Sequence, residues 1–361
     1  MIDASTGGAK TFILQRLPSL AGVRFAAATA VAIVLLSVLL LEAGGYDSSL
    51  ALRAWWNGSL GSSYALTSAT LVRATPLIVT GLAVALAFQA GVFNIGAEGQ
   101  LLTGAAIGAV IGVKLSAALG VLTLPAELVA GAMAGAFWAG IAAWLRSRFG
   151  VLEVISTIML NFVALHAVGF LVRGPLQEPL AIYPQSDALP RVAQLPKLIP
   201  GTRLHWGLLV AVAAAVLLWW VLRHTAAGFR LRAGGANPDA ARSAGLIDVG
   251  RVTATAFLVS GALAGLAGAV ELTGVTFALY ENISPGYGYT AIAVALLARL
   301  DPLAVVGAGF FFGALEAGAG AMQRDAGVPA AFVSVVEAGI VLAVIAFDRV
   351  RDKRDNRGGI S

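Results

Sequence analysis

The sequence predicts an all-α polytopic membrane protein with about ten transmembrane helices. Only 12% of its 361 residues are charged, whereas a soluble domain carries about 25%. Hydrophobic residues make up 58% of the chain, and the mean hydropathy is +0.85. The apolar residues form runs close to the ~20 residues that a transmembrane helix needs, and they do not alternate as the strands of a barrel would.

Ten spans are expected from these runs. They cover residues 24–44, 64–88, 96–115, 121–145, 152–172, 205–222, 252–273, 288–299, 302–321 and 330–348. Small residues recur inside them, as at Gly261, Gly265 and Gly268, and this spacing lets helices approach closely in lipid. Span 288–299 is short, so we expect it to be tilted or broken.

The basic residues predict that the N- and C-termini are both cytoplasmic. With the N-terminus inside, the cytoplasmic segments hold 16 of the 24 Lys and Arg residues and the outer segments hold seven. This bias is typical of cytoplasmic loops. It also explains the net charge of +5 without nucleic acid, which we do not expect as a partner.

Three segments are expected along the chain. Residues 1–63 would form an N-terminal tail, a first transmembrane helix and an interfacial segment. Residues 64–348 would form the transmembrane domain, with a proline-rich outer loop at 173–204 and a basic cytoplasmic loop at 223–251. Residues 349–361 would form a basic cytoplasmic tail.

Composition also excludes several kinds of chemistry. The chain has no Cys and only three His, which argues against a disulfide scaffold and a zinc site. It has no glycine-rich loop ending in Gly-Lys-Ser or Gly-Lys-Thr, so we expect no nucleotide hydrolysis by this chain. We therefore expect no catalytic residue, no metal and no cofactor, and any ATP-driven motor would be a separate protein.

Two polar, glycine-rich interruptions break the apolar pattern, at residues 93–100 and 281–290. Non-helical backbone is tolerated at membrane depth only against protein or a water-lined cavity. The interruptions therefore indicate a substrate path, although an interhelical polar contact or a short cytoplasmic loop would also explain the first. The residues that we expect to line this path are Asn94, Glu98, Gln100, Tyr287, Tyr289 and Thr290.

The two interruptions occupy corresponding places in the chain. Each follows a long span, 64–88 or 252–273, and each leads into a helix rich in small residues. The charge count places the first on the cytoplasmic side and the second on the outer side. An inverted repeat of spans two to five and seven to ten would give this pattern, and paired interruptions of this kind indicate a transport site at the repeat interface.

A polar stripe marks span 152–172. Glu153, Thr157 and Asn161 are spaced by four residues and so share one helical face, which we expect to point into the bundle or a cavity. Thr157 and Asn161 join the expected substrate path, with helix packing equally open for Asn161. Glu153 is expected at the interface.

Further charges fall inside the apolar spans. They could form a proton relay, but no single span carries a ladder of Asp, Glu and His. We expect Arg73 to pair with a carboxylate or with carbonyl groups, and Glu98 is one candidate for that carboxylate. The charges in question are Arg73, Glu127, Glu271, Glu316 and Glu337.

The cytoplasmic loop contains the signature of a short surface helix. Asn237 is a good N-cap, Pro238 suits the first turn, Asp239 complements the helix dipole and Gly245 ends the segment. A capped helix between two spans is suited to dock another protein, although a plain solvated connector is the alternative. The residues expected to couple to a partner are Arg230, Asn237, Pro238, Asp239 and Arg242.

Several of these segments resemble one known family. The runs at 74–85, 91–100, 153–161 and 286–297, with the loop at 228–245, look like the permease subunits of ABC importers of the ribose and branched-chain amino acid type. The run Asn-Ile-Gly-Ala-Glu-Gly-Gln at 94–100 is closest to their nucleoside and simple-sugar branch. The resemblance covers about residues 64–348.

This resemblance implies an ATP-driven importer's membrane subunit in the bacterial cytoplasmic (inner) membrane. Its partners would be an ABC ATPase subunit, a second permease subunit, an extracytoplasmic substrate-binding protein and the lipid bilayer. The loop at 228–245 would contact the ATPase. The substrate would be a nucleoside or a related simple sugar, with a monosaccharide or a branched-chain amino acid as alternatives. A stand-alone secondary transporter or channel is the competing class, and it would not need the docking helix.

Overall fold

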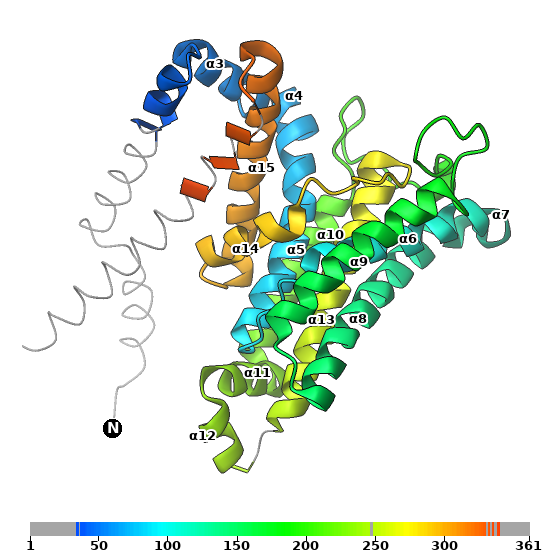
Figure 1. Cartoon of the computed structure of the whole chain (residues 1–361), viewed down its shortest axis with the longest axis vertical. Coiled ribbons are helices and arrows are strands. Elements are labelled where there is room, and N and C mark those ends of the chain that lie inside the picture. Colours follow the sequence, from blue (N-terminus) through cyan, green and yellow to red (C-terminus); the bar gives the residue numbers. More distant parts are fainter. Residues whose placement is uncertain are drawn as a thin grey trace, which may run out of the picture. The chain divides into compact units, whose positions relative to one another are not determined.

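The computed structural model describes residues 34–35, 37–245, 248–329, 331–332, 334–335 and 338–339. This part of the chain is mainly helical, with isolated β-bridges between Gln177 and Ser186, Gln185 and Tyr280, and Lys197 and His205. Figure 1 labels its main helices. In chain order they are α3 (Ser48–Ser59), α4 (Ser63–Ala65), η1 (Leu66–Thr70), α5 (Leu71–Gln89), α6 (Ala97–Lys114), α7 (Ser116–Leu119), η2 (Gly120–Leu122), α8 (Thr123–Phe149), α9 (Glu153–Arg173), η3 (Arg191–Ala193), α10 (Gly207–His224), α11 (Ala226–Ala236), α12 (Pro238–Ser243), α13 (Val249–Glu271), η4 (Leu272–Thr276), α14 (Tyr287–Leu297) and α15 (Pro302–Ala326).

The all-α, multi-span class is confirmed, but a count of ten spans is not. Six helical segments among the described residues are long and apolar enough to cross a membrane: Ser63–Gln89, Ser116–Phe149, Glu153–Arg173, Gly207–His224, Val249–Thr276 and Pro302–Ala326. Predicted span 96–115 corresponds to α6, whose Glu98, Gln100 and Lys114 reduce its apolar character. Predicted spans 24–44 and 330–348 lie largely outside the described residues.

The chain forms two compact units, of which Trp55–Ala321 is the larger and contains the expected site. At its centre α13 packs against α5, α6 and α8. The glycines predicted to allow close packing do so, since Gly261 and Gly265 lie directly against the backbone of α8, and Gly268 against that of α6. Small residues thus replace bulky side chains where helices must approach closely in lipid.

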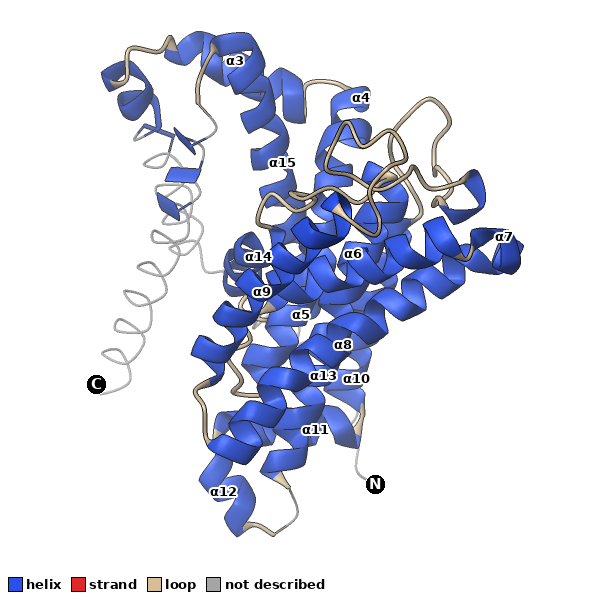
Figure 2. Cartoon of the chain, turned by 45° about the vertical axis from the view of Figure 1, so that its right-hand side comes forward, coloured by secondary structure: helices blue, strands red, loops and turns tan. Residues whose placement is uncertain are grey.

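The two kinds of loop lie at opposite ends of this unit. The proline-rich loop after α9 is at one end, and α11 and α12 are at the other (Figure 2). The proline-rich loop is folded back on the segment after α13, because the Ser186 N–H donates to the Leu279 carbonyl at 2.9 Å. Its tip is closed by Glu178, whose carboxylate accepts from the Gln185 amide at 2.6 Å and the Tyr183 N–H at 2.9 Å. These hydrogen bonds lower the pKa of Glu178 below its ordinary value of 4.5.

Candidate functional site

The two predicted interruptions meet in the folded chain. The Glu98 carboxylate, in the first turn of α6, accepts from the Gly288 N–H at the start of α14 at 2.7 Å. The Ser284 hydroxyl also bonds this carboxylate, and Ser284 Oγ accepts from the Tyr287 N–H at 3.0 Å. A Cβ at Gly288 would lie 2.5 Å from Glu98 Cα, so only glycine allows this approach. We call this contact of two helix N-termini the junction.

The junction lies near the middle of the membrane-spanning bundle. α14 has eleven residues and rises about 16 Å, roughly half of an apolar core of about 30 Å. Gly81 of α5 packs against Val294 of α14, and both helices run toward the hydrogen bond from Gln89 to the Leu300 carbonyl. Tyr287 precedes Val294 by seven residues of α14, so it lies about 10 Å farther along the helix from the hydrogen bond between Gln89 and Leu300. It therefore lies level with the central part of the 27-residue segment Ser63–Gln89.

Asn161 joins three helices at this point. Its Oδ1 accepts from the Gly99 N–H at 2.8 Å, and its Nδ2 donates to the Ile95 carbonyl at 2.9 Å. The same Nδ2 lies 3.3 Å from the Tyr289 hydroxyl on α14. Asn161 thus satisfies backbone groups that the broken start of α6 leaves unpaired, and it also fixes the position of Tyr289.

Asn94 and Gln100 form a closed amide pair below the junction. Asn94 Nδ2 donates to Gln100 Oε1 at 3.0 Å, and Gln100 Nε2 donates to Asn94 Oδ1 at 2.9 Å. Asn94 also donates to the Ser260 hydroxyl and accepts from the Gly96 N–H. Both side chains are fully buried. In this conformation their hydrogen bonds hold the turn before α6 against α13.

The remaining expected site residues differ in their access to a ligand. Tyr287 is buried, whereas Tyr289 is 46% exposed and Thr290 is half-buried. Thr157 is buried, its hydroxyl donates to the Glu153 carbonyl at 2.7 Å, and it lies against Gly96. Tyr289 and Thr290 are therefore the members of the set that present side-chain surface.

Sequence reasoning missed two serines of the site. Ser260 bridges the amide pair to the Ala83 carbonyl, and Ser284 caps the start of α14. Neither was singled out, because serine is common and the partners that bring them into the site are remote in the chain: Ala83 and Asn94 for Ser260, and Glu98 for Ser284. Arg73 interacts electrostatically with Glu271 and Tyr287, as the expectation of a carboxylate partner allowed, while Glu98 is engaged by α14.

The expected coupling segment contains the predicted short helix. Asn237 Oδ1 accepts from the Ala240 N–H at 3.0 Å as the N-cap of α12, Pro238 occupies the first turn, and Gly245 has a φ of +68°. The side chains of Asp239 and Arg242 form an ion pair at 2.9 Å and are 91% and 63% exposed. Arg230, on the preceding α11, is also exposed.

α11 connects this segment to the bundle. Gly235 lies directly on the end of α5, since a Cβ there would be 2.6 Å from the Ala90 carbonyl carbon. Gly228 likewise lies against Leu222 of α10, and Arg232 donates to the Leu222 carbonyl. The capped helix α12 is therefore exposed, while its neighbour α11 is fixed to α5 and α10. Among the described residues no group of three or more His, Asp and Glu is placed to hold a metal ion.

Comparisons with known proteins identify related chains. Residues 66–345 match the family described as the permease component of a branched-chain amino acid transport system. A glucose ABC transporter permease protein of Haloferax volcanii is 42% identical over 82% of both chains. A guanosine ABC transporter permease protein of Bacillus subtilis is 38% identical over 87% of this chain and 90% of its own. A nucleoside ABC transporter permease protein of Lactococcus lactis is 32% identical over 86% and 87%.

Proposed function

This chain belongs to the permease-component family of branched-chain amino acid transport systems, and we propose that, as the membrane subunit of an ABC importer, it carries a nucleoside or a related simple sugar across the cytoplasmic membrane. ATP hydrolysis takes place in a separate subunit in such importers. The observation that carries the proposal is the junction, where the first turns of α6 and α14 meet inside the bundle beside an exposed tyrosine. Broken helices at a repeat interface are where transporters bind their substrates.

The chemistry of the junction suits an uncharged polar ligand with a flat face. The Glu98 carboxylate is engaged by Gly288 and Ser284, so it does not present a bare charge. Tyr289 offers its ring, and its hydroxyl is held by Asn161. A nucleobase would stack on such a ring, and Thr290 would hydrogen-bond a ribose or hexose hydroxyl.

The other expected substrate-path residues then have a supporting role. Asn94, Gln100, Thr157 and Asn161 hold the two helix starts in place, and Tyr287 is buried at the start of α14. Opening of the bundle would expose some of these groups to the passing ligand. Such an opening would either break the hydrogen bonds between Asn94 and Gln100 or move the two residues together.

α12 is the proposed docking helix for the ATPase subunit. A shift of α12 would reach α11, whose Gly235 lies on the end of α5. α5 packs along α14, and α14 starts at the junction. A contiguous set of packed helices thus leads from the docking helix to the proposed substrate site. A second permease subunit and an extracytoplasmic binding protein would complete the importer.

ATP-dependent uptake into proteoliposomes tests the substrate. The complete importer would be given labelled guanosine, glucose or leucine at matched protein levels. We expect guanosine uptake, with glucose as the alternative that the Haloferax relative favours. Tyr289→Leu should reduce guanosine uptake about tenfold through loss of stacking. Tyr64→Leu, which removes an exposed ring from α4, is the matched control. Leucine uptake alone, or equal uptake by both variants, would refute the assignment.

A further inference from the structure

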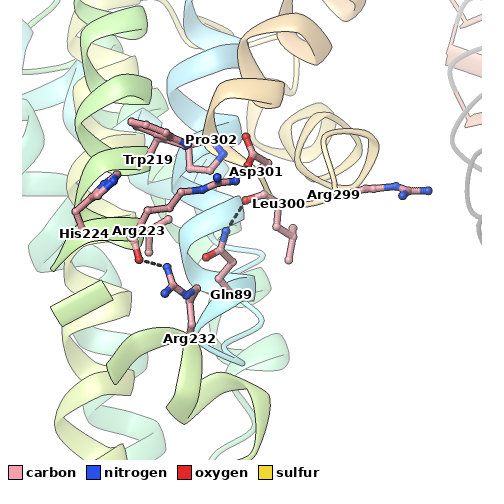
Figure 3. Close-up of a pocket in the computed structure, with 10 residues that line it drawn as sticks. Gln89, Trp219, Arg223, His224, Arg232, Arg299, Leu300, Asp301 and Pro302 are labelled. Carbon is pink, nitrogen blue, oxygen red and sulfur yellow. Dashed lines mark hydrogen bonds and ion pairs between the residues drawn. The ribbon is translucent and has the colours of Figure 1, made fainter. Parts of the chain in front are cut away.

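A cleft of about 640 Å3 lies at the C-terminal end of α5 (Figure 3). Gln89 forms its base, the last turn of α10 and Arg232 of α11 form one wall, and the turn between α14 and α15 forms the other. Its volume falls in the range of about 300–1,000 Å3 that is typical of ligand sites. Neither the junction nor the exposed surface of α12 contributes to it.

The cleft is basic. Its lining includes Arg223, Arg232, Arg299 and His224, against a single carboxylate, Asp301. Arg299 points away from the other side chains (Figure 3), so Arg223 and Arg232 are the guanidinium groups that flank the space. An anion that enters therefore meets positive charge on the α10–α11 wall.

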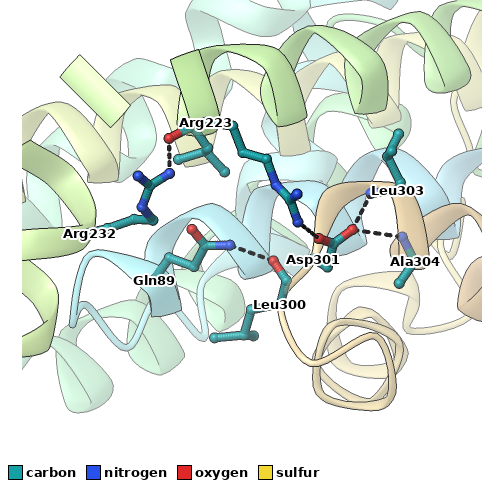
Figure 4. Close-up of polar contacts among 8 residues, drawn as sticks. Gln89, Arg223, Arg232, Leu300, Asp301, Leu303 and Ala304 are labelled. Carbon is teal, nitrogen blue, oxygen red and sulfur yellow. Dashed lines mark hydrogen bonds and ion pairs between the residues drawn. The ribbon is translucent and has the colours of Figure 1, made fainter. Parts of the chain in front are cut away.

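Asp301 offsets only part of this charge. One of its oxygens accepts from Arg223 at 3.0 Å, and the other accepts from the N–H groups of Leu303 and Ala304 at the start of α15 (Figure 4). Arg232 donates to the Leu222 carbonyl. Each guanidinium has five N–H donors and uses one of them in these contacts, so further donors remain to bind an anion. Guanidinium groups match the oxygens of phosphate in geometry as well as in charge.

The mouth of the cleft adjoins surface that is suited to lipid. On α10 the side chains of Val216, Leu217 and Trp220 are 49%, 61% and 51% exposed. Trp219 lies under the Arg223 guanidinium, which is 5.6 Å from its ring centroid. Trp and Arg together at a helix end are typical of the membrane interface. Acyl chains would lie along α10 while a headgroup occupies the cleft.

The opposite wall is held rigidly. Arg299 and Leu300 have φ values of +51° and +61°, a left-handed backbone conformation that is strained for residues other than glycine. The amide of Gln89 donates to the Leu300 carbonyl at 2.5 Å and fixes this turn to α5. A site built on a constrained turn is organised before its ligand arrives.

We propose that this cleft binds a phosphate-bearing anion, with the headgroup of an anionic phospholipid as its source. Basic pockets between helices on the cytoplasmic side of a membrane protein are suited to such headgroups. The bound phosphate would bridge Arg232 of α11 and Arg223 of α10, and Arg223 is in turn paired with Asp301 of the α14–α15 turn. It would thereby connect the base of the coupling segment to the helix that starts at the junction. The proposal does not depend on which substrate is transported.

Native mass spectrometry of the delipidated full chain tests the site. Phosphatidylglycerol, phosphatidylcholine and inorganic phosphate are added separately. We expect phosphatidylglycerol to be retained about tenfold better than phosphatidylcholine, and Arg223→Gln with Arg232→Gln to remove that preference. Arg148→Gln with Arg251→Gln removes the same amount of charge from exposed positions at the same end of the helical bundle, and should leave the preference for phosphatidylglycerol intact.

These additions distinguish the two sources of phosphate. A preference for phosphatidylglycerol that is lost in the cleft variant, Arg223→Gln with Arg232→Gln, and kept in the control variant supports a lipid site. A thermal shift from millimolar inorganic phosphate, lost only in the cleft variant and without lipid preference, supports a site for soluble phosphate. Equal behaviour of both double variants overturns the proposal. If the double variant Arg223→Gln with Arg232→Gln does not fold, Arg232→Gln alone replaces it, because this variant keeps the ion pair between Arg223 and Asp301.

Discussion

Gly288→Ala is the sharpest perturbation of the junction. The new Cβ would lie 2.5 Å from Glu98 Cα and 2.8 Å from the Ala97 carbonyl carbon, and these backbone atoms cannot rotate away. Moving α14 aside to relieve such overpacking costs about 1–3 kcal/mol. The movement also lengthens the 2.7 Å hydrogen bond from Gly288 to the Glu98 carboxylate, and a bond to a charged group contributes about 1.5–3 kcal/mol. Since one displacement causes both losses, we expect a net destabilisation of about 2–4 kcal/mol.

The assay is thermal unfolding in detergent, followed by size-exclusion recovery after heating. Gly307→Ala on α15 is the matched control, because a Cβ there has no neighbour within 4 Å. We expect Gly288→Ala to melt well below the wild type and Gly307→Ala to melt at or above it. Glu98→Gln should cost less in the Gly288→Ala background than alone, since the two residues share one contact. Equal melting of the two alanine variants would refute the close approach of the helix starts.

Three further predictions concern the rest of the molecule. Asn94→Leu should lower stability by about 1–3 kcal/mol, because it leaves buried Gln100 and Ser260 groups unpaired; thermal melting beside the conservative Asn94→Gln measures this, and unchanged melting would contradict the closed amide pair. Asn237→Ala should destabilise α12 by about 1 kcal/mol and weaken ATPase co-purification, while Asn237→Ser should retain both; full binding by the alanine variant would leave α12 a connector. The loop closed by Glu178 should lose protection from hydrogen exchange as the pH falls below 4.5 and through the lowered pKa of Glu178, because a carboxylate with a depressed pKa stabilises the fold only while it is ionised. Gln185→Leu should weaken this protection at neutral pH, and protection in the wild type that does not change with pH would exclude the closure.

Local signals in the sequence were sufficient for α12 and for the helix breaks. Asn237, Pro238, Asp239 and Gly245 act within a few residues of one another, so their effect does not depend on the rest of the fold. The same holds for the start of α14, where Ser284, Pro285 and Gly286 prevent a continuous helix. The glycines of α13 were also predictable, because their spacing reports the need for close contact.

Long-range pairing could not be read from the sequence. Asn94 and Gln100 are polar residues in an apolar run, a pattern equally typical of a ligand site and of a closed hydrogen-bonded pair. Their mutual bonds and the bridge to Ser260, 166 residues away, depend on how α6 packs against α13. Tyr287 and Tyr289 have the same local context, yet helix packing buries one and exposes the other. The short predicted span 288–299 corresponds to the eleven-residue α14, and six segments of the described part of the chain are long and apolar enough to cross a membrane.

Site-specific cross-linking tests the central claim, that α12 couples this permease to its ATPase. A cysteine at exposed Ser243 at the end of α12, and another at exposed Ala188 in the opposite loop, are each introduced into the natural cysteine-free chain. We expect a short thiol cross-linker to join Ser243→Cys to the co-expressed ATPase subunit and Ala188→Cys not to do so. Exchange of Asp239 and Arg242 keeps their ion pair but reverses the presented charges, and should reduce the Ser243→Cys yield. Cross-linking of the ATPase from Ala188→Cys and not from Ser243→Cys would contradict the account.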